Sequence, residues 1–117
     1  MFPRALTPPE LNGLLEQASD RLLLVYLWGP DCPNCVIFKR SLQQFESKLD
    51  ELPLEFVSVD AYSYPEVARR YAVHGIPHFL LFKGGRKIGK MSEFRGEKFW
   101  LAVVREQATG VAEPAPP

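Results

Sequence analysis

The length, composition and charge of the chain exclude several classes of protein. A chain of 117 residues forms one domain, and 46% hydrophobic residues suffice for a single core. Fourteen basic residues balance fourteen acidic ones, so the charge favours neither nucleic acid nor an anionic membrane as a partner. The longest apolar run, Leu22–Trp28, has the length of a strand and is too short to span a membrane.

The amino-terminal part of the chain predicts a helix and then a buried strand. Residues 1–7 lead into the domain, with or without a short outer strand. Thr7 and Glu10 have the spacing of a capping box, and prolines between them suit a first turn, so we expect a helix to about Ser19. No apolar segment of the signal-peptide type precedes Glu10, which predicts a cytoplasmic location. Leu22–Trp28 resembles a central strand buried on both faces.

The following residues predict a parallel strand–helix–strand unit. Apolar side chains recur at helical spacing between Val36 and Leu49. We expect the core-facing residues of this helix to be Val36, Ile37, Phe38, Leu42, Phe45 and Leu49. Leu54–Asp60 is predicted to be a second strand. Passing from a buried strand through a helix to another strand implies a right-handed crossover with parallel strands.

The second half of the chain predicts a short helix, a hairpin and a final helix. The helix spans about residues 64–71, and a break at His74-Gly75-Ile76-Pro77 precedes a strand over residues 78–83. Gly84-Gly85 is typical of a tight hairpin turn, from which residues 86–91 return antiparallel.

The final helix is predicted from about Gly96 to Ala108. Its expected core-facing residues are Phe99, Trp100, Val103 and Val104. Residues 109–117 are rich in proline, alanine and glycine, which predicts a disordered tail behind a domain that spans residues 1–108.

The only two cysteines of the chain, Cys32 and Cys35, lie between the first buried strand and the next helix. Cys32 is expected at or near the N-cap, with Pro33 at the first helical position, where its missing N–H has no cost. Free backbone N–H groups and the helix dipole would stabilise a thiolate on Cys32. Cys35 follows one turn later. The pair can therefore cycle between dithiol and disulfide, with Cys32 attacking and Cys35 resolving the mixed disulfide.

Two other roles for the cysteines compete with this interpretation. With His74 and His78 they complete a Cys2His2 set for zinc. The stretch between the two pairs is much longer than in a zinc finger, and Gly75 and Pro77 prevent a helix that carries both imidazoles. A purely structural disulfide would close a very small loop and add little stability. The strand–turn–helix context favours the redox pair.

The order of the elements, together with three motifs, resembles the thioredoxin family. The motifs are Trp28-Gly29-Pro30-Asp31-Cys32-Pro33-Asn34-Cys35, Val59-Asp60-Ala61 and Gly75-Ile76-Pro77-His78-Phe79-Leu80-Leu81-Phe82-Lys83-Gly84-Gly85. The resemblance covers about residues 8–108. It implies an α/β thioredoxin fold, with a central mixed β-sheet flanked by helices.

The resemblance also implies a thiol–disulfide oxidoreductase that acts on protein disulfides. Cys32 would be the nucleophile and Cys35 the resolving thiol. Pro77 would be cis and would shape the substrate groove, and the backbone of Ile76 would pair with the substrate chain. Trp28 would belong to the core or to the groove wall. The reaction would need no organic cofactor and no metal, electrons would come from a partner reductase or a small thiol, and the protein would be a monomer.

Several residues depart from the usual thioredoxin pattern and are expected to tune the redox chemistry. Pro33-Asn34 replaces the Gly-Pro that thioredoxins carry between the cysteines, a position that influences redox poise. Asp31 replaces a tryptophan. Its carboxylate opposes ionisation of the nucleophile, or it is a plain turn residue. Tyr26 and Phe56 replace a buried aspartate and a nearby lysine. The resolving thiol would then lack an internal base, and exchange would be slower or more specialised.

These departures leave two alternative functions open. Because of Tyr26 and Asp31, the chain could be a thioredoxin-like redox sensor, chaperone or binding module with little turnover. The cysteines could instead hold a metal ion or an iron–sulfur cluster, even across a dimer. His74 and His78 flank the Gly-Ile-Pro break, where an imidazolium would favour the thiolate of Cys32, although histidines in such places more often have no such role.

Overall fold

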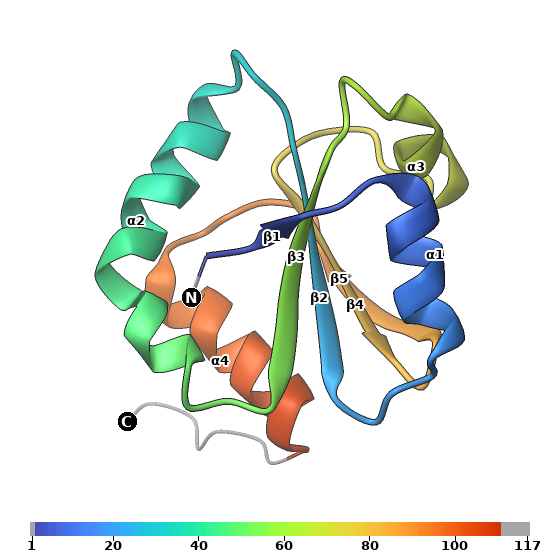
Figure 1. The fold of residues 1–117 in the computed structure, drawn as a ribbon. Coiled ribbons are helices and arrows are strands. Elements are labelled where there is room, and N and C mark those ends of the chain that lie inside the picture. The colour runs from blue at the N-terminus through green and yellow to red at the C-terminus, as the bar shows by residue number, and fades with distance from the viewer. Residues whose placement is uncertain (1, 111–117) are drawn as a thin grey trace.

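Five strands form one mixed sheet in the order β1-β3-β2-β4-β5 in the computed structural model of the chain (Figure 1). The structure describes residues 2–110. The strands are β1 (Arg4–Ala5), β2 (Leu22–Trp28), β3 (Leu54–Asp60), β4 (His78–Lys83) and β5 (Arg86–Met91). β2 is parallel to β3 and antiparallel to β4, and β5 is antiparallel to β4. The predicted mixed sheet is therefore confirmed, including the predicted bounds of β2 and β3.

Helices cover both faces of the sheet. They are α1 (Pro8–Glu16), α2 (Pro33–Leu49), α3 (Pro65–Arg70) and α4 (Glu97–Thr109). Figure 1 shows α2 and α4 on one side of the sheet and α1 and α3 on the other. The capping box of α1 is formed as predicted, because the Thr7 N–H donates to Glu10 Oε1 at 2.9 Å and Thr7 Oγ1 accepts from the Glu10 N–H. The helix ends at Glu16, before the predicted Ser19, because Ala18 turns into the left-handed region with φ +48°.

Two hydrophobic cores sandwich the central strand. The larger core, under α2 and α4, is built around the fully buried ring of Trp100. Its centroid lies 5.4–6.0 Å from those of four phenylalanines, Phe38, Phe45, Phe56 and Phe79. The smaller core, under α1 and α3, takes the alternate residues of β2 and β3. Burial on both faces fixes β2, and the cysteine motif follows directly from its end.

Three residues that helical spacing predicted in the core are exposed instead. Val36 is 49% exposed, Ile37 is 53% exposed and Phe99 is 50% exposed. The buried face of α2 consists of Cys35, Phe38, Leu42, Phe45 and Leu49. Each helical residue is rotated by about 100° from the one before, so Val36 and Ile37 turn away from the face that Cys35 occupies. On α4 the buried residues are Trp100, Leu101, Val104 and Ala108.

The hairpin and the carboxyl-terminal helix follow the predicted pattern closely. Gly84 and Gly85 have φ values of +60° and +77°, which suits the tight turn that joins β4 to β5. The last helix continues to Thr109, one residue past its predicted end, and Gly110 caps it. Residues 111–117 lie outside the described residues, so the disordered tail and the domain limits stay predictions. Between residues 2 and 110, no helix is long and apolar enough to cross a membrane.

Candidate redox site

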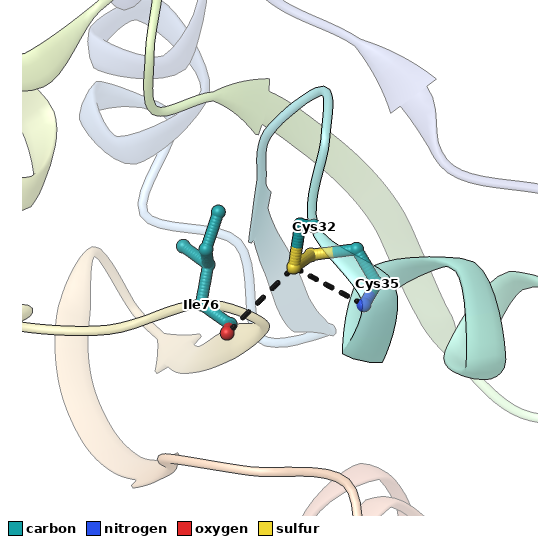
Figure 2. The surroundings of a disulfide bond; sticks show 3 residues. All are labelled: Cys32, Cys35 and Ile76. Atoms are coloured by element: carbon teal, nitrogen blue, oxygen red, sulfur yellow. Dashed lines mark hydrogen bonds between the residues drawn. A yellow bond between two sulfur atoms is a disulfide. The ribbon is translucent and has the colours of Figure 1, made fainter.

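The two cysteines lie at the first turn of α2. Cys32 is the N-cap and Pro33 occupies the first helical position, as predicted. The Cys35 backbone N–H donates to Cys32 Sγ at 3.2 Å, and the Cα atoms lie 5.2 Å apart with the sulfurs joined as a disulfide (Figure 2). An N–H aimed at sulfur at a helix start stabilises negative charge there. This geometry favours a thiolate on Cys32 once the disulfide opens.

The Gly-Ile-Pro segment faces the disulfide from the start of β4. The Ile76–Pro77 peptide bond is cis, as the resemblance implied. The Ile76 carbonyl oxygen lies 3.8 Å from Cys32 Sγ, although the two residues are 44 positions apart, and Figure 2 shows it pointing toward that sulfur. Cys32 is 7% exposed and Cys35 only 5%. A partner disulfide can reach Cys32 along the border between these two segments.

Tyr62, which the sequence interpretation did not single out, forms part of that border. A Cβ added to Gly29 would lie 2.9 Å from both Ile76 Cδ1 and Tyr62 Cε2, so these side chains close over the glycine. Asp60 Oδ1 accepts from the Tyr62 N–H at 2.9 Å, which fixes the turn after β3. Tyr62 nevertheless stays 57% exposed. We call Gly29, Tyr62 and Ile76 the Tyr62 shelf, an apolar ledge beside Cys32.

The residues around the cysteine pair occupy turn and surface positions. Asp31 is exposed and has φ +59°, a left-handed conformation that aspartate tolerates better than most residues. This geometry supports the turn role of Asp31. Pro33 and Asn34 are exposed on the first turn of α2, and their influence on redox poise stays a prediction. Trp28 is partly buried against the larger core, which agrees with the predicted core placement.

Tyr26 is a buried member of the aromatic core. Its ring is stacked on Phe79 with centroids 5.2 Å apart and an angle of 14°, and it lies 4.9 Å from Phe38. Burial raises the pKa of Tyr26 to about 12, so the phenol keeps its proton at neutral pH and cannot take one from Cys35. Phe56 belongs to the same core. A lone carboxylate or ammonium would be strongly desolvated in these surroundings, which explains why both charges are absent together.

The two histidines do not join the cysteines in a metal site. His78 is buried, and its Nε2 has no hydrogen-bond partner among residues 2–110. Burial lowers the pKa of His78, and the nearby Lys90 and Lys87 lower it further. His74 is exposed. In the described part of the chain, no three His, Cys, Asp or Glu side chains gather closely enough to hold a metal ion, so the Cys2His2 alternative is not formed.

Comparison with known proteins identifies the family. Residues 4–105 match the family model described as thioredoxin. The chain belongs to the thioredoxin family. It is 28% identical over 101 residues to human glutaredoxin-3, covering 86% of this chain and 30% of that protein. It is 26% identical to the thioredoxin-like protein YusE of Bacillus subtilis, covering 84% of this chain and 91% of that protein. The chain thus spans under a third of the length of human glutaredoxin-3.

Solved structures of thioredoxins share the fold of this chain. Fasciola hepatica thioredoxin superposes with a TM-score of 0.77 at 23% identity, covering 89% of this chain and 98% of that chain. Malassezia sympodialis thioredoxin gives a TM-score of 0.74 at 17% identity, covering 92% of each chain. Family membership and a Cys-x-x-Cys pair at disulfide distance are the features of a thiol–disulfide oxidoreductase site.

Proposed function

We propose that the protein is a thiol–disulfide oxidoreductase that exchanges electrons with disulfides of other proteins. The observation that carries this proposal is the position of the disulfide. It caps α2, accepts an N–H bond on Cys32 and touches the cis-proline segment. A purely structural disulfide would not need this arrangement, and it would add little stability here because the loop that it closes has only a few residues.

The proposed reaction is two successive thiol–disulfide exchanges. The Cys32 thiolate attacks one sulfur of the substrate disulfide, a mixed disulfide forms, and the released substrate thiolate takes up a proton. Cys35 then loses its proton and attacks Cys32 Sγ, which expels the second substrate thiolate and leaves the Cys32–Cys35 disulfide. Two electrons pass from the cysteine pair to the substrate. A reductase or a small thiol would return them, and no organic cofactor is needed because the sulfurs carry both electrons.

The substrate chain is proposed to lie along Ile76 and Pro77. The Ile76 carbonyl already faces Cys32, so an extended chain paired with this segment would bring its own cysteine to the attacking sulfur. The Tyr62 shelf would support an apolar side chain next to that cysteine. Trp28 would line the other side of the motif. We place the protein in the cytoplasm and expect it to act as a monomer.

Trapping of mixed disulfides tests the proposal. In Cys35→Ser the first exchange proceeds and the second cannot, so covalent adducts with disulfide proteins should accumulate on Cys32. They should appear on non-reducing gels and disappear with dithiothreitol. Cys32→Ser is the matched control and should trap nothing, because it removes the N-cap sulfur to which the Cys35 N–H donates. Equal trapping by both variants, or by neither, would refute the assignment of roles.

A redox sensor with little turnover is the second candidate, and Tyr26 favours it. Its phenol, with a pKa of about 12, cannot help to deprotonate Cys35 at neutral pH. A sensor would be oxidised once and reduced slowly, whereas an oxidoreductase turns over many times with a thiol donor. Multiple-turnover insulin reduction, together with the reduction potential of the pair, separates the two. A potential close to those of reducing thioredoxins supports a reductant, and a much more positive one supports an oxidant or a sensor.

A further inference from the structure

A hollow of about 640 Å³ opens beside the disulfide. It lies at the end of β2, the middle of β3, the first turns of α2 and the segment that leads into β1. Cys32 and Cys35 both line it, whereas Ile76 and Pro77 do not. The disulfide therefore has two neighbourhoods, the cis-proline segment and this hollow. The function proposed above uses the first of them and, beyond the two cysteines, only Trp28 of the second.

Two mostly buried residues with hydroxyl groups belong to the lining of the hollow. Tyr26 on β2 and Ser58 on β3 are register partners on adjacent parallel strands, so their side chains lie on the same face of the sheet. Tyr26 is 7% exposed and Ser58 is 5% exposed. Among residues 2–110, only His78 Nε2 and Trp100 Nε1 are fully buried polar side-chain atoms without a hydrogen-bond partner. The two hydroxyls, for which the described residues supply no partner, are therefore open to the hollow and available to water or a ligand.

The rest of the lining is mainly apolar. Trp28, Val36 and Phe2 contribute accessible apolar surface, whereas Phe38 and Leu42 lie beneath it and are 0% and 1% exposed. The charged residues of the lining, Asp31 and Lys39, are exposed and carry opposite signs. A site of this kind favours a neutral molecule, because a charged one would lose its hydration without a buried counter-charge. The volume falls within the range of about 300–1,000 Å³ that is typical of small-molecule sites.

We propose that this hollow binds a small neutral aromatic molecule that carries one hydroxyl group, that is, a phenol. Its ring packs on Trp28 and Val36, and its hydroxyl exchanges hydrogen bonds with Tyr26 and Ser58. The bound molecule lies against the disulfide without occupying the cis-proline segment. The proposal does not depend on the direction or the rate of thiol–disulfide exchange.

The test is a titration of the oxidised full-length chain with p-cresol, followed by two-dimensional NMR of the backbone amides. We expect saturable shifts centred on Trp28 and Cys35. Toluene lacks the hydroxyl and should bind about five- to tenfold more weakly, since each net hydrogen bond is worth a factor of about 2–10. Benzoate carries a charge and should not bind. Absence of saturation with p-cresol would overturn the proposal and indicate that the hollow holds only water.

Variants locate the site and isolate the role of the hydroxyls. In Tyr26→Phe and in Ser58→Ala the preference for p-cresol over toluene should fall to about two- to threefold, because one of the two hydrogen bonds remains. The affinity for toluene should stay close to that of the parent. Gln43→Trp places a large side chain at an exposed position in the lining and should abolish binding. Gln44→Trp, the next exposed residue on α2 but outside the lining, is the matched control and should bind normally. Binding that survives Gln43→Trp, or an unchanged preference in both hydroxyl variants, would refute the site.

Discussion

Restoring a carboxyl group at position 26 is the sharpest test of the core beneath the cysteine pair. Tyr26→Asp removes a ring that is 7% exposed and contacts Phe79 and Phe38 at centroid distances of 5.2 and 4.9 Å. Loss of a buried aromatic side chain destabilises a protein by about 3–5 kcal/mol. The two ring pairs account for about 1–3 kcal/mol of that loss. We therefore expect the free energy of unfolding at pH 5 to fall by at least about 3 kcal/mol.

The introduced carboxyl group adds a dependence on pH. Burial among aromatic rings, without the partner lysine that Phe56 replaces, would raise its pKa above the ordinary value of about 3.9. The unfolded state then loses its proton at a lower pH than the folded state, so the stability of the variant falls further as the pH rises from 4 to 8. The asparagine in Tyr26→Asn has a volume similar to that of aspartate but no charge. Its loss of free energy of unfolding should therefore not grow with pH.

Urea unfolding of the parent, Tyr26→Asp, Tyr26→Asn and Tyr26→Phe at pH 5 and pH 8 measures these effects. Tyr26→Phe keeps the ring and should stay within about 1.5 kcal/mol of the parent, because only a hydroxyl is removed. A stability of Tyr26→Asp within 1 kcal/mol of the parent at both pH values would contradict the packing described here. Equal stability of the aspartate and asparagine variants at pH 8 would contradict the desolvation argument.

Three further predictions concern rate, pH and specificity. Insulin reduction at neutral pH should be slower than by a thioredoxin with the buried carboxylate, because Tyr26 cannot act as a base; equal rates would remove this explanation. Burial lowers the pKa of His78 below 6.5, so the unfolded chain takes up a proton on this residue at a higher pH than the folded chain does. The free energy of unfolding in urea should therefore fall as the pH drops from 7.5 to 5.0. His78→Leu should lose part of this decline, whereas the exposed His74→Leu should keep all of it, and identical pH profiles would contradict the assignment. Tyr62→Ala should lower kcat/KM about tenfold for peptide disulfides with an apolar residue beside the cysteine, and little for those with serine there. Its urea stability should change by no more than about 0.5 kcal/mol, as is usual for exposed residues.

Local patterns were sufficient to predict the frame of the molecule. The apolar run of β2, the prolines that begin helices and the Gly84-Gly85 turn each specify their own conformation over a few residues, and the structure confirms them. The N-cap position of Cys32 follows from the same kind of local signal. The cis bond at Pro77 was implied by the family resemblance, because nothing local distinguishes it from a trans turn.

Features that depend on distant residues were not predictable in this way. Val36, Ile37 and Phe99 are apolar and lie next to true core positions, but which side of a helix is buried depends on where the sheet lies. The Tyr62 shelf forms only because the turn after β3 meets the segment before β4. In the sequence, the only sign of it was an aromatic residue directly after the Val59-Asp60-Ala61 motif. The hollow is likewise a product of four separate segments.

The two outer strands of the sheet are poorly suited to pairing between molecules. β1 has only two residues, and β5 carries Arg86, Lys87 and Lys90, which would repel the same strand of a second copy. Short or positively charged margins of this kind discourage strand addition between molecules. If the backbone at Ile76 pairs with substrate chains as proposed, the two margins of the sheet would not compete with it for extended segments.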